Sequence, residues 1–158
     1  MAGAVSIVPF EERHHAACTA ILGALPDWFG IPESNTAYLQ GLRELPAFVA
    51  LRDGDVVGFA SLRPHFERSA ELEVMAVRPD QHRSGVGRAL VRHCEAWLRA
   101  RGFAVLHVKT LAPSHPDPFY ARTRAFYLAL GFEPVFETPA LWGPENPALV
   151  SVKLLSRS

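Results

Sequence analysis

The stretch from Glu71 to Arg101 reads ELEVMAVRPDQHRSGVGRALVRHCEAWLRAR, and it decides the fold that the sequence predicts. Its first seven residues are typical of a β-strand, which must end before Pro79. From Gly85 onward the apolar side chains recur every four residues, as in a helix that buries one face, and Gly102 is placed to end that helix. The stretch is therefore expected to form a strand, a glycine-containing turn and a long helix.

The turn between this strand and this helix is suited to bind an anion. A helix N-terminus carries unpaired N–H groups and a partial positive charge, and both favour a phosphate group. Gly85 and Gly87 would let the backbone approach phosphate oxygens, and Arg83 and Arg88 would add charge-assisted hydrogen bonds. The spacing fits neither a P-loop nor a dinucleotide fingerprint, because the P-loop lysine is missing and position 90 is Leu. Taken alone, the pattern is also compatible with an ordinary tight turn.

Further helices and strands are expected on both sides of this stretch. Helices are predicted at 11–25, 34–44 and 118–130, with Ser34 and Asp117 as N-caps and Gly131 as the last stop signal. Strands are predicted at 4–8, 47–52, 56–62, 103–109, 132–137 and 148–155, with a hairpin turn around Asp53-Gly54-Asp55. This order favours one α/β or α+β sheet with helices on its faces, in a single domain spanning 1–158.

The composition argues against several classes of function. Sixteen Lys and Arg residues balance sixteen Asp and Glu residues, so no basic excess points to nucleic acid or to a membrane surface. No apolar stretch approaches the roughly 20 residues that span a bilayer, and the N-terminus lacks the pattern of a signal peptide. We therefore expect a cytoplasmic protein. Cys18 and Cys94 belong to no CxxC pair and are expected to be buried and reduced.

Two motifs resemble those of the GNAT superfamily of N-acetyltransferases. Residues 71–79 and 82–90 are similar to the family's L-x-V-x-P strand end and [QR]-x-x-G-x-[GA] helix start. Tyr127-x-x-x-Gly131-Phe132 is similar to its Y-x-x-x-G-F helix end. The order of elements also matches, so the resemblance covers nearly the whole chain. It implies an α/β (α+β) fold with a mixed, mostly antiparallel sheet of about seven strands flanked by about four helices. It also implies acetyl-CoA as co-substrate, no metal, and family members that often dimerise through terminal strands.

The resemblance also implies where acetyl-CoA binds. Backbone groups at Met75, Ala76 and Val77 would pair with the pantetheine arm. The pyrophosphate would bind the turn and the first helical amides, at His82, Arg83, Ser84, Gly85, Val86, Gly87 and Arg88. Tyr120 and Arg124 of the later helix would line the cofactor channel or contact phosphates. Tyr120 and Thr123 stand where the family often has Asn and Ala, so the contact of that Asn is not expected here.

Two carboxylates are the candidates for proton removal from an amine. Glu71 and Glu73 alternate on one strand, so we expect both to share a face with Met75. Carboxylates beside an apolar groove are costly unless they have a partner or a role. The family often places its base at these positions, so Glu73 is expected as base before Glu71, directly or through water. The alternative is a surface ion pair with Arg63 or Arg68.

Tyr127 is the candidate acid for the leaving thiolate, because the family places this tyrosine close to the thioester sulfur. A packed aromatic with a satisfied hydroxyl is the alternative for this residue. Acyl transfer also needs hydrogen-bond donors for the developing oxyanion. It requires neither a metal nor a covalent intermediate.

The acceptor is expected to lie against the loop between the first two helices. Trp28 and Phe29 would pack against it, or would simply anchor that loop, and Trp142 of the last hairpin would form the opposite wall. The predicted reaction is acetyl transfer from acetyl-CoA directly to a primary amine of a small molecule. Protein or peptide amines, and a non-catalytic acyl-CoA-binding sensor, are the alternatives.

The histidines predict no metal site. His14 and His15 are adjacent, so their side chains point about 100° apart on a helix. His65, His107 and His115 stand alone in the sequence.

Overall fold

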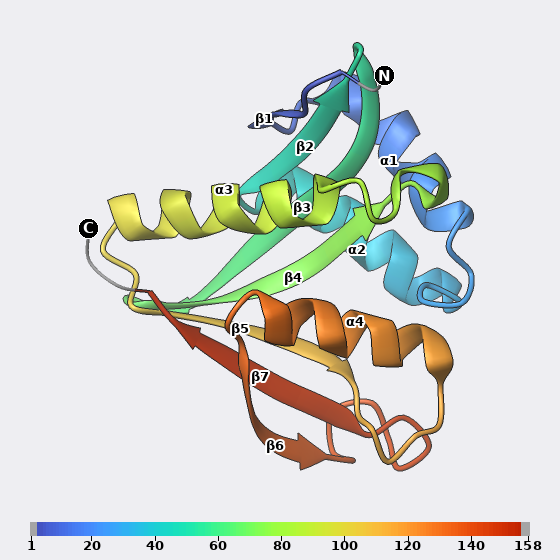
Figure 1. Cartoon of the computed structure of the whole chain (residues 1–158), viewed down its shortest axis with the longest axis vertical. Helices are drawn as coiled ribbons and strands as arrows, with labels where there is room; N and C mark the ends of the chain where they lie inside the picture. The colour runs from blue at the N-terminus through green and yellow to red at the C-terminus, as the bar shows by residue number, and fades with distance from the viewer. Residues whose placement is uncertain (1–2, 156–158) are drawn as a thin grey trace.

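A seven-stranded sheet is the frame of residues 3–155, which this computed structural model describes. Its strand order is β1-β2-β3-β4-β5-β7-β6 (Figure 1). The strands are β1 Ser6–Pro9, β2 Ala47–Arg52, β3 Asp55–Phe66, β4 Ser69–Val77, β5 Val105–Leu111, β6 Glu133–Thr138 and β7 Ala148–Leu154. The helices of the same range are α1 His15–Gly23, α2 Pro32–Glu44, α3 Val86–Ala100 and α4 Pro118–Ala129, with 3-10 turns η1 Glu12–His14 and η2 Pro79–Gln81. Within these residues, the predicted α/β (α+β) fold of seven mostly antiparallel strands and four helices is confirmed.

The parallel contact between β4 and β5 is short. It consists of three residue pairs, from Ser69 opposite Val105 to Glu71 opposite His107. Beyond Glu71 the two strands diverge, as Figure 1 shows for the green and yellow strands near its centre. The edge of β4 that faces β5 is therefore left without a strand partner over its second half, and a ligand can occupy the gap.

Helices cover the two faces of the sheet unequally. α3 and α4 lie on one face, in front of the sheet in Figure 1, where Leu90 and Leu106 are fully buried. α1 and α2 lie on the other face over β2 to β4, where they bury Ile21, Leu42 and Val74. Each such aliphatic side chain contributes about 2 kcal/mol when it is fully buried. The second face of β5 and β7 has no helix of the described range on it.

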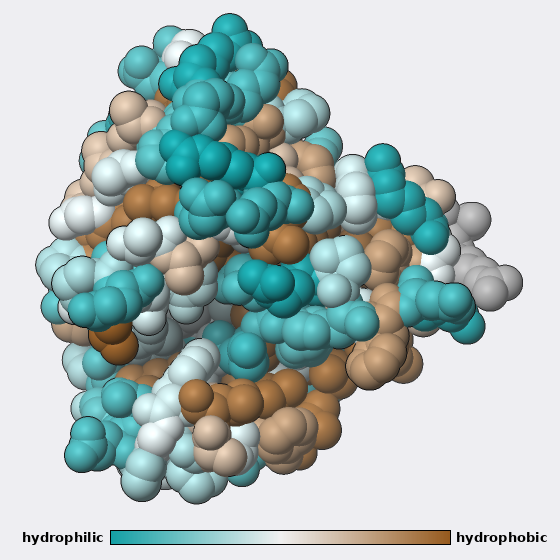
Figure 2. Space-filling view, turned by 180° about the vertical axis from the view of Figure 1, so that it is seen from behind, coloured by the Kyte–Doolittle hydropathy of each residue, from teal (hydrophilic) through white to brown (hydrophobic). Residues whose placement is uncertain are grey.

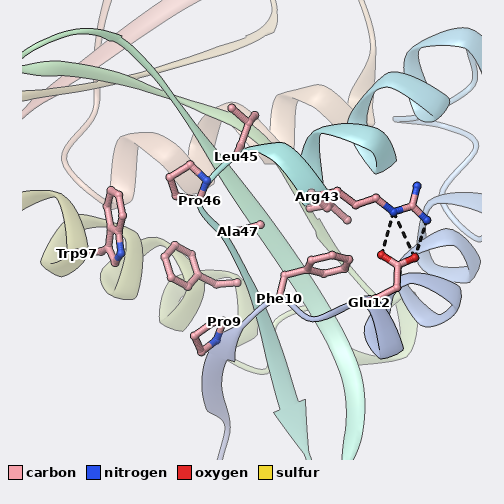
Figure 3. A pocket seen from close by; sticks show the side chains of 10 residues that line it. Pro9, Phe10, Glu12, Arg43, Leu45, Pro46, Ala47 and Trp97 are labelled. Carbon is pink, nitrogen blue, oxygen red and sulfur yellow. Dashed lines mark hydrogen bonds and ion pairs between the residues drawn. The ribbon is translucent and has the colours of Figure 1, made fainter.

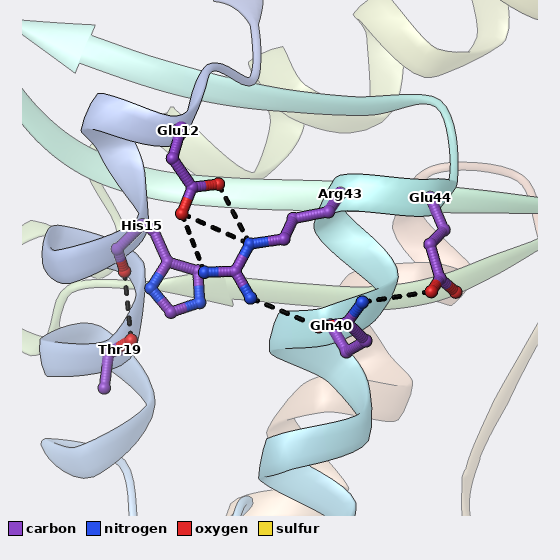
Figure 4. Close-up of polar contacts among 6 residues, drawn as sticks. All are labelled: Glu12, His15, Thr19, Gln40, Arg43 and Glu44. Carbon is purple, nitrogen blue, oxygen red and sulfur yellow. Dashed lines mark hydrogen bonds and ion pairs between the residues drawn. The ribbon is translucent and has the colours of Figure 1, made fainter.

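An exposed ion pair joins η1 to α2. Arg43 donates from Nε and one terminal nitrogen to both carboxylate oxygens of Glu12, at distances of 2.9 and 2.7 Å (Figure 4). Its other terminal nitrogen donates to Gln40, which in turn donates to Glu44. These contacts lie on the surface, so they contribute little beyond fixing the direction of α2.

Helix ends follow the sequence signals in most places. Asp117 caps α4, since its Oδ1 accepts from the backbone N–H groups of Phe119 and Tyr120 at 2.9 and 3.3 Å. Ser34 as the cap of α2 is wrong, because α2 begins at Pro32 and Ser34 lies within its first turn. Proline has a fixed φ and no N–H, so it is well suited to the first position of a helix.

The strand limits differ more from the prediction. The first hairpin turn consists of Asp53 and Gly54, whose φ angles of 53° and 83° suit a two-residue turn between Arg52 and Asp55. β3 continues to Phe66, four residues beyond its predicted end, because its second half pairs with the start of β4. That pairing is distant in sequence and leaves no local signal.

A bulge in β4 changes which side chains share a face. Ser61 pairs with Val74, but the next residue of β3, Leu62, pairs with Leu72. Glu73 is therefore the extra residue of β4, and the alternation of side chains shifts by one position at this point.

The bulge corrects the prediction that the glutamates and Met75 share a face. Leu72 packs with α3, whereas Val74 packs with α1 and α2. Glu71 therefore points to the side of α2, whereas Met75 packs toward α3. The strand carries its carboxylates on one side of the sheet and its Met75 side chain on the other.

Two expectations from composition can be compared with the fold. Cys18 and Cys94 are unpaired and fully buried, and burial raises the pKa of each thiol to about 12. The prediction that both cysteines are buried is confirmed. Within residues 3–155, none of the helices combines the length and apolar character needed to cross a bilayer.

Candidate active site

A cavity of about 1180 Å³ opens where β4 and β5 diverge. Its walls come from β4, β5, α2, α4, the loop between α1 and α2, and the segment before α3. From behind, the surface of the molecule is hollowed between its upper and lower parts (Figure 2). The cavity thus lies at the one break in the described part of the sheet.

The start of α3 has the backbone geometry that the anion prediction requires. Gly85 is the N-cap with a φ of 87°, and Arg83 also has a positive φ of 62°. A side chain at position 85 would be strained, whereas an added Cβ at Gly87 would lie only 3.1 Å from Cζ of Phe126. The first glycine therefore serves the turn, and the second serves the close approach of α3 to α4. The N–H groups of Val86 and its successors remain available to an anion.

Arg52 of β2 braces this turn, although no sequence motif marks this residue. Its Nε donates to the carbonyl of Gly3 at 2.8 Å, and its terminal nitrogens donate to Gln81 and to the side chain and carbonyl of Ser84. The Ser84 hydroxyl donates to the carbonyl of Gln81. The side chain of Ser84 thus holds the turn together, so its backbone is the part left for a phosphate.

His82 faces the strand end. Its Nε2 donates to the carbonyl oxygen of Val77 at 2.9 Å. The imidazole is therefore engaged with the strand end, and the role of His82 in binding a pyrophosphate stays a prediction.

Trp28 spans the cavity from the loop before α2 to α4. Its indole N–H donates to Oγ1 of Thr123 at 3.1 Å, and its carbonyl accepts from the Tyr120 hydroxyl at 3.0 Å. Its ring meets those of Phe119 and His82 edge-on. Burial, with smaller contributions from Tyr38 and Asp117, raises the pKa of Tyr120 to about 12, so its hydroxyl stays neutral and fixes the loop.

The other predicted contact residues differ in position. Phe29 packs edge-on against Tyr38 of α2, so it anchors the loop as well as lining the cavity. Trp142 lines the opposite wall and is 41% exposed. Arg124 does not line the cavity, because its guanidinium donates to the carbonyl of Leu111 at 2.6 Å and ties α4 to β5.

Glu73 lines the cavity but already has a partner. Its two oxygens accept from Nε and a terminal nitrogen of Arg63 at 3.0 and 3.1 Å. The alternative foreseen for this residue, an ion pair with Arg63, is the contact that forms. Since the Glu73 side chain is 19% exposed, it can still exchange protons with water in the cavity.

Glu71 is buried among three basic side chains. Its Oε1 lies 2.8 Å from Nε2 of His65 and 3.6 Å from Nε2 of His107, and its Oε2 lies 2.9 Å from Nζ of Lys109. Burial opposes ionisation, but hydrogen bonds from His107, His65 and Lys109 outweigh it and lower the pKa of Glu71 to about 2. Glu71 is therefore a fixed negative charge and a weak base.

The expectation that His65 and His107 stand alone is wrong. Sheet pairing places His107 of β5 beside Glu71, and His65 approaches the same carboxylate from the end of β3. His107 is distant from His65 in sequence, and no local motif marks the pairing.

The matches with known proteins agree with this geometry. Residues 10–132 match the sequence profile of the Acetyltransferase (GNAT) family. This chain belongs to the GNAT family. An aminoglycoside N(6')-acetyltransferase type 1 of Klebsiella aerogenes is 41% identical over 75 residues, which are 41% of this chain and 49% of that protein. The match thus spans about half the length of that relative.

Solved structures of GNAT proteins share the fold. The ribosomal-protein-S18-alanine N-acetyltransferase of Escherichia coli has a TM-score of 0.77 at 24% identity, covering 98% of this chain and 96% of that one. An aminoglycoside 6'-N-acetyltransferase complexed with coenzyme A has a TM-score of 0.74 at 18% identity, covering 97% and 98%. Identities this low support the common fold alone.

Tyr127 of this GNAT protein lies deep in the cavity wall. It is 7% exposed and packs edge-on between Phe126 and Phe132, with ring centroids 5.1 and 5.4 Å away. Burial, followed by the nearby Cys94 and Tyr120, raises the pKa of Tyr127. The hydroxyl therefore stays protonated, which suits a proton donor.

A second cavity of the GNAT chain, about 460 Å³, lies away from this site (Figure 3). Its walls are mostly apolar, with Phe10, Phe48 and Trp97 among them. The ionisable side chains in its wall, Glu12 and Arg43, bond to each other (Figure 3). It offers no group for acyl transfer.

Proposed function

We propose that this protein is a single-domain N-acetyltransferase that moves the acetyl group of acetyl-CoA directly onto a primary amine of a small molecule. The observation that carries the proposal is the divergence of β4 from β5. It leaves a strand edge, a helix N-terminus, two carboxylates and a buried tyrosine around one cavity. Acetyl transfer from a thioester needs this set of groups.

The residues present fit acetyl-CoA, which supplies the activated acetyl group. The backbone of β4 from Met75 to Val77 has no strand partner on the side of β5, although the Val77 carbonyl accepts from His82, and it would hydrogen-bond an extended arm as a neighbouring strand would. The amides that open α3 would bind a pyrophosphate, since a helix N-terminus of this kind favours anions. Gly87, which has no side chain, lets the first turn of α3 lie close to Phe126 of α4.

The proposed chemistry assigns a role to each ionisable group. The cationic amine first gives one proton to water, its neutral nitrogen attacks the thioester carbonyl, the carbon–sulfur bond breaks, and the nitrogen then loses a second proton. Glu73, or a water beside it, accepts that proton, because this carboxylate is partly exposed in the cavity. Tyr127 donates a proton to the leaving thiolate. Glu71 stays ionised and holds its basic neighbours in place at the cavity wall, since Lys109 already balances its charge.

The acceptor is proposed to be a small, cationic amine. The side chains of Glu71 and Glu73 line a cavity that also has aromatic walls at Trp28 and Trp142. The Klebsiella relative, which acts on aminoglycosides, supports polyamine-bearing small molecules as the first class to test. The Escherichia coli structure, which is that of a protein-alanine acetyltransferase, makes peptide amines the second class.

An amine panel read by thiol release tests the proposal. The panel holds aminoglycosides, simple diamines and peptides with free N-termini, each with acetyl-CoA and a thiol reagent. We expect steady release of free CoA with at least one small amine. If acetyl-CoA raises the melting temperature but no amine releases thiol, the chain is a binding module and the enzyme proposal fails. Turnover with peptides alone would instead overturn the small-molecule acceptor.

A further inference from the structure

Three neighbouring strands bring two imidazoles and a carboxylate together on the face of the sheet opposite α3. His65 lies at the end of β3, Glu71 in β4 and His107 in β5. Their potential ligand atoms all lie within 4.8 Å of one another. The sheet register fixes Glu71 opposite His107, whereas His65 lies at the irregularity of β3 between Pro64 and Phe66.

The distances within this cluster suit one small ion. Oε1 of Glu71 is 2.8 Å from Nε2 of His65 and 3.6 Å from Nε2 of His107. Bonds of about 2.0–2.2 Å in a tetrahedral site separate neighbouring ligand atoms by about 3.3 Å, which lies between these two distances. The carboxylate thus lies near ligand distance from both imidazoles, and the ligand atoms of the two histidines lie within 4.8 Å of each other.

The surroundings leave room for binding and for exchange. The Glu71 side chain is 4% exposed, whereas those of His107 and His65 are 23% and 39% exposed. The carboxylate of the cluster is thus buried in the sheet, and its two imidazoles are accessible to solvent. A water molecule could complete the coordination from the open side.

Lys109 does not occupy the atom that a metal would use. Its ammonium bonds to Oε2 of Glu71 at 2.9 Å, and Oε1 faces the two imidazoles. A second partner on the far oxygen of a ligating carboxylate is a common arrangement, because it fixes the direction of the ligand.

We propose that His65, Glu71 and His107 form a site for one divalent transition-metal ion of the zinc class. Two imidazoles and one carboxylate select zinc, cobalt or nickel over magnesium and calcium, which prefer oxygen ligands. The proposed acetyl transfer needs no metal, and the metal site shares Glu71 with the wall of the cavity.

Cobalt binding tests the site without any measurement of catalysis. Co²⁺ is titrated into the full chain, prepared without a histidine tag, and the visible absorption of tetrahedral cobalt is followed. We expect saturation at one ion per chain, loss of the absorption when Zn²⁺ is added, and a higher melting temperature with Zn²⁺. Absence of the visible bands at millimolar Co²⁺, together with no zinc effect on melting, would overturn the site.

Matched histidine variants decide whether these residues are the ligands. His65→Ala and His107→Ala should each weaken cobalt binding at least about tenfold. His15→Ala, which removes a histidine on α1, should bind cobalt like the parent chain. His107→Gln repeats the test with nearly unchanged volume, in case the alanine variant folds poorly. Equal affinity in the parent chain and both ligand variants, or a loss in His15→Ala alone, would refute the assignment.

Discussion

Tyr127 and Tyr120 lie on the same helix but use their hydroxyl groups differently. The Tyr120 hydroxyl already donates to the carbonyl of Trp28, whereas the Tyr127 ring is packed between two phenylalanines at the cavity wall. We predict that Tyr127→Phe lowers kcat at least about tenfold, because general-acid assistance is lost. The KM for acetyl-CoA should stay within a few-fold. Steady-state kinetics with a saturating amine measure both constants.

The raised pKa of Tyr127 adds a pH dependence to this prediction. An ordinary tyrosine begins to lose its proton near pH 10, and a raised pKa keeps the acid form present above that value. The kcat of the parent chain should therefore not fall between about pH 8 and about pH 10. Tyr120→Phe is the control, and it should change substrate affinity more than kcat. A Tyr127→Phe variant with full turnover would remove this residue from the mechanism.

Substitutions of the two glutamates of β4 should have different effects, on stability for Glu71 and on activity for Glu73. Glu71→Gln leaves Lys109 without its buried carboxylate, so we predict a loss of about 2 kcal/mol in the free energy of unfolding. For a chain of this size, the melting temperature would fall by about 4–8 °C. Glu73→Gln breaks a partly exposed pair with Arg63, which costs at most about 1 kcal/mol.

The activity of the same variants completes the test. Glu73→Gln should lower kcat/KM at least about tenfold, since an amide cannot accept the amine proton. Thermal unfolding and thiol-release rates are measured on both proteins. A Glu71→Gln variant as stable as the parent chain, or a Glu73→Gln variant of unchanged rate, would contradict these assignments.

At this scale, sequence reasoning found the chemical groups but not their partners. The resemblance to the GNAT family implies Glu71, Glu73 and Tyr127 through their positions in the matching motifs. Their environments depend on contacts between distant segments, such as His107 beside Glu71. The bulge at Glu73, which separates the carboxylates from the Met75 side, arises from pairing with β3 and has no local signal.

At the scale of elements, the turn before α3 depends on one arginine of β2. Arg52 donates to Gln81 and Ser84 within the turn and to the carbonyl of Gly3. We predict that Arg52→Ala raises the KM for acetyl-CoA about tenfold, because misplacement of the binding loop costs affinity. The kcat at saturation should change less than about threefold.

Arg78 offers a matched control on the same turn. Its guanidinium pairs with Asp80, which is an exposed carboxylate two residues away. Arg78→Ala removes the same charge near the proposed pyrophosphate site but leaves the bracing of the turn intact. Its KM for acetyl-CoA should stay within about twofold of the parent value. Equal effects of the two variants would mean that Arg52 acts through charge and not through position.

The elements themselves were predictable where the signal is local. Asp117 before Pro118, and the glycines at 102 and 131, mark helix ends that the structure reproduces. Ser34 failed because a stronger local signal, Pro32, begins the same helix earlier. The length of β3 failed for another reason, since strand length is decided by the partner strand.

At the scale of the whole molecule, the sheet is weakly paired between β4 and β5, where the cavity opens. The sequence predicted the order of elements, but not that β4 and β5 would share only three residue pairs. Contacts outside the sheet must therefore help to join the first group of strands, β1 to β4, to the second group, β5 to β7. α3 packs on the first group of strands. Lys153 of β7, in the second group, forms an ion pair with Glu95 of α3, whose side chain is fully buried.

Substitution of Lys153 should lower the free energy of unfolding of the whole domain, because this residue connects β7 to α3 and α4. Its ammonium donates to Glu95 of α3 at 2.8 Å and to the carbonyl of Leu130 at the end of α4. Lys153→Met leaves the buried Glu95 with Arg99 alone, 3.5 Å away. We predict a loss of about 3 kcal/mol, because a buried charge without its partner is costly. The melting temperature should fall by about 6–12 °C.

The double variant Lys153→Met, Glu95→Leu distinguishes a lost ion pair from poor packing. Removing the orphaned carboxylate should restore most of the stability, since apolar replacements of buried ion pairs are often neutral. Calorimetry on the parent chain, both single variants and the double variant gives the coupling between the two residues. Since the two groups of strands meet at the cavity, acetyl-CoA should also stabilise the single Lys153 variant by bridging them. A double variant no more stable than Lys153→Met would show that Glu95 is not what the lysine holds, and that the halves of the sheet are joined elsewhere.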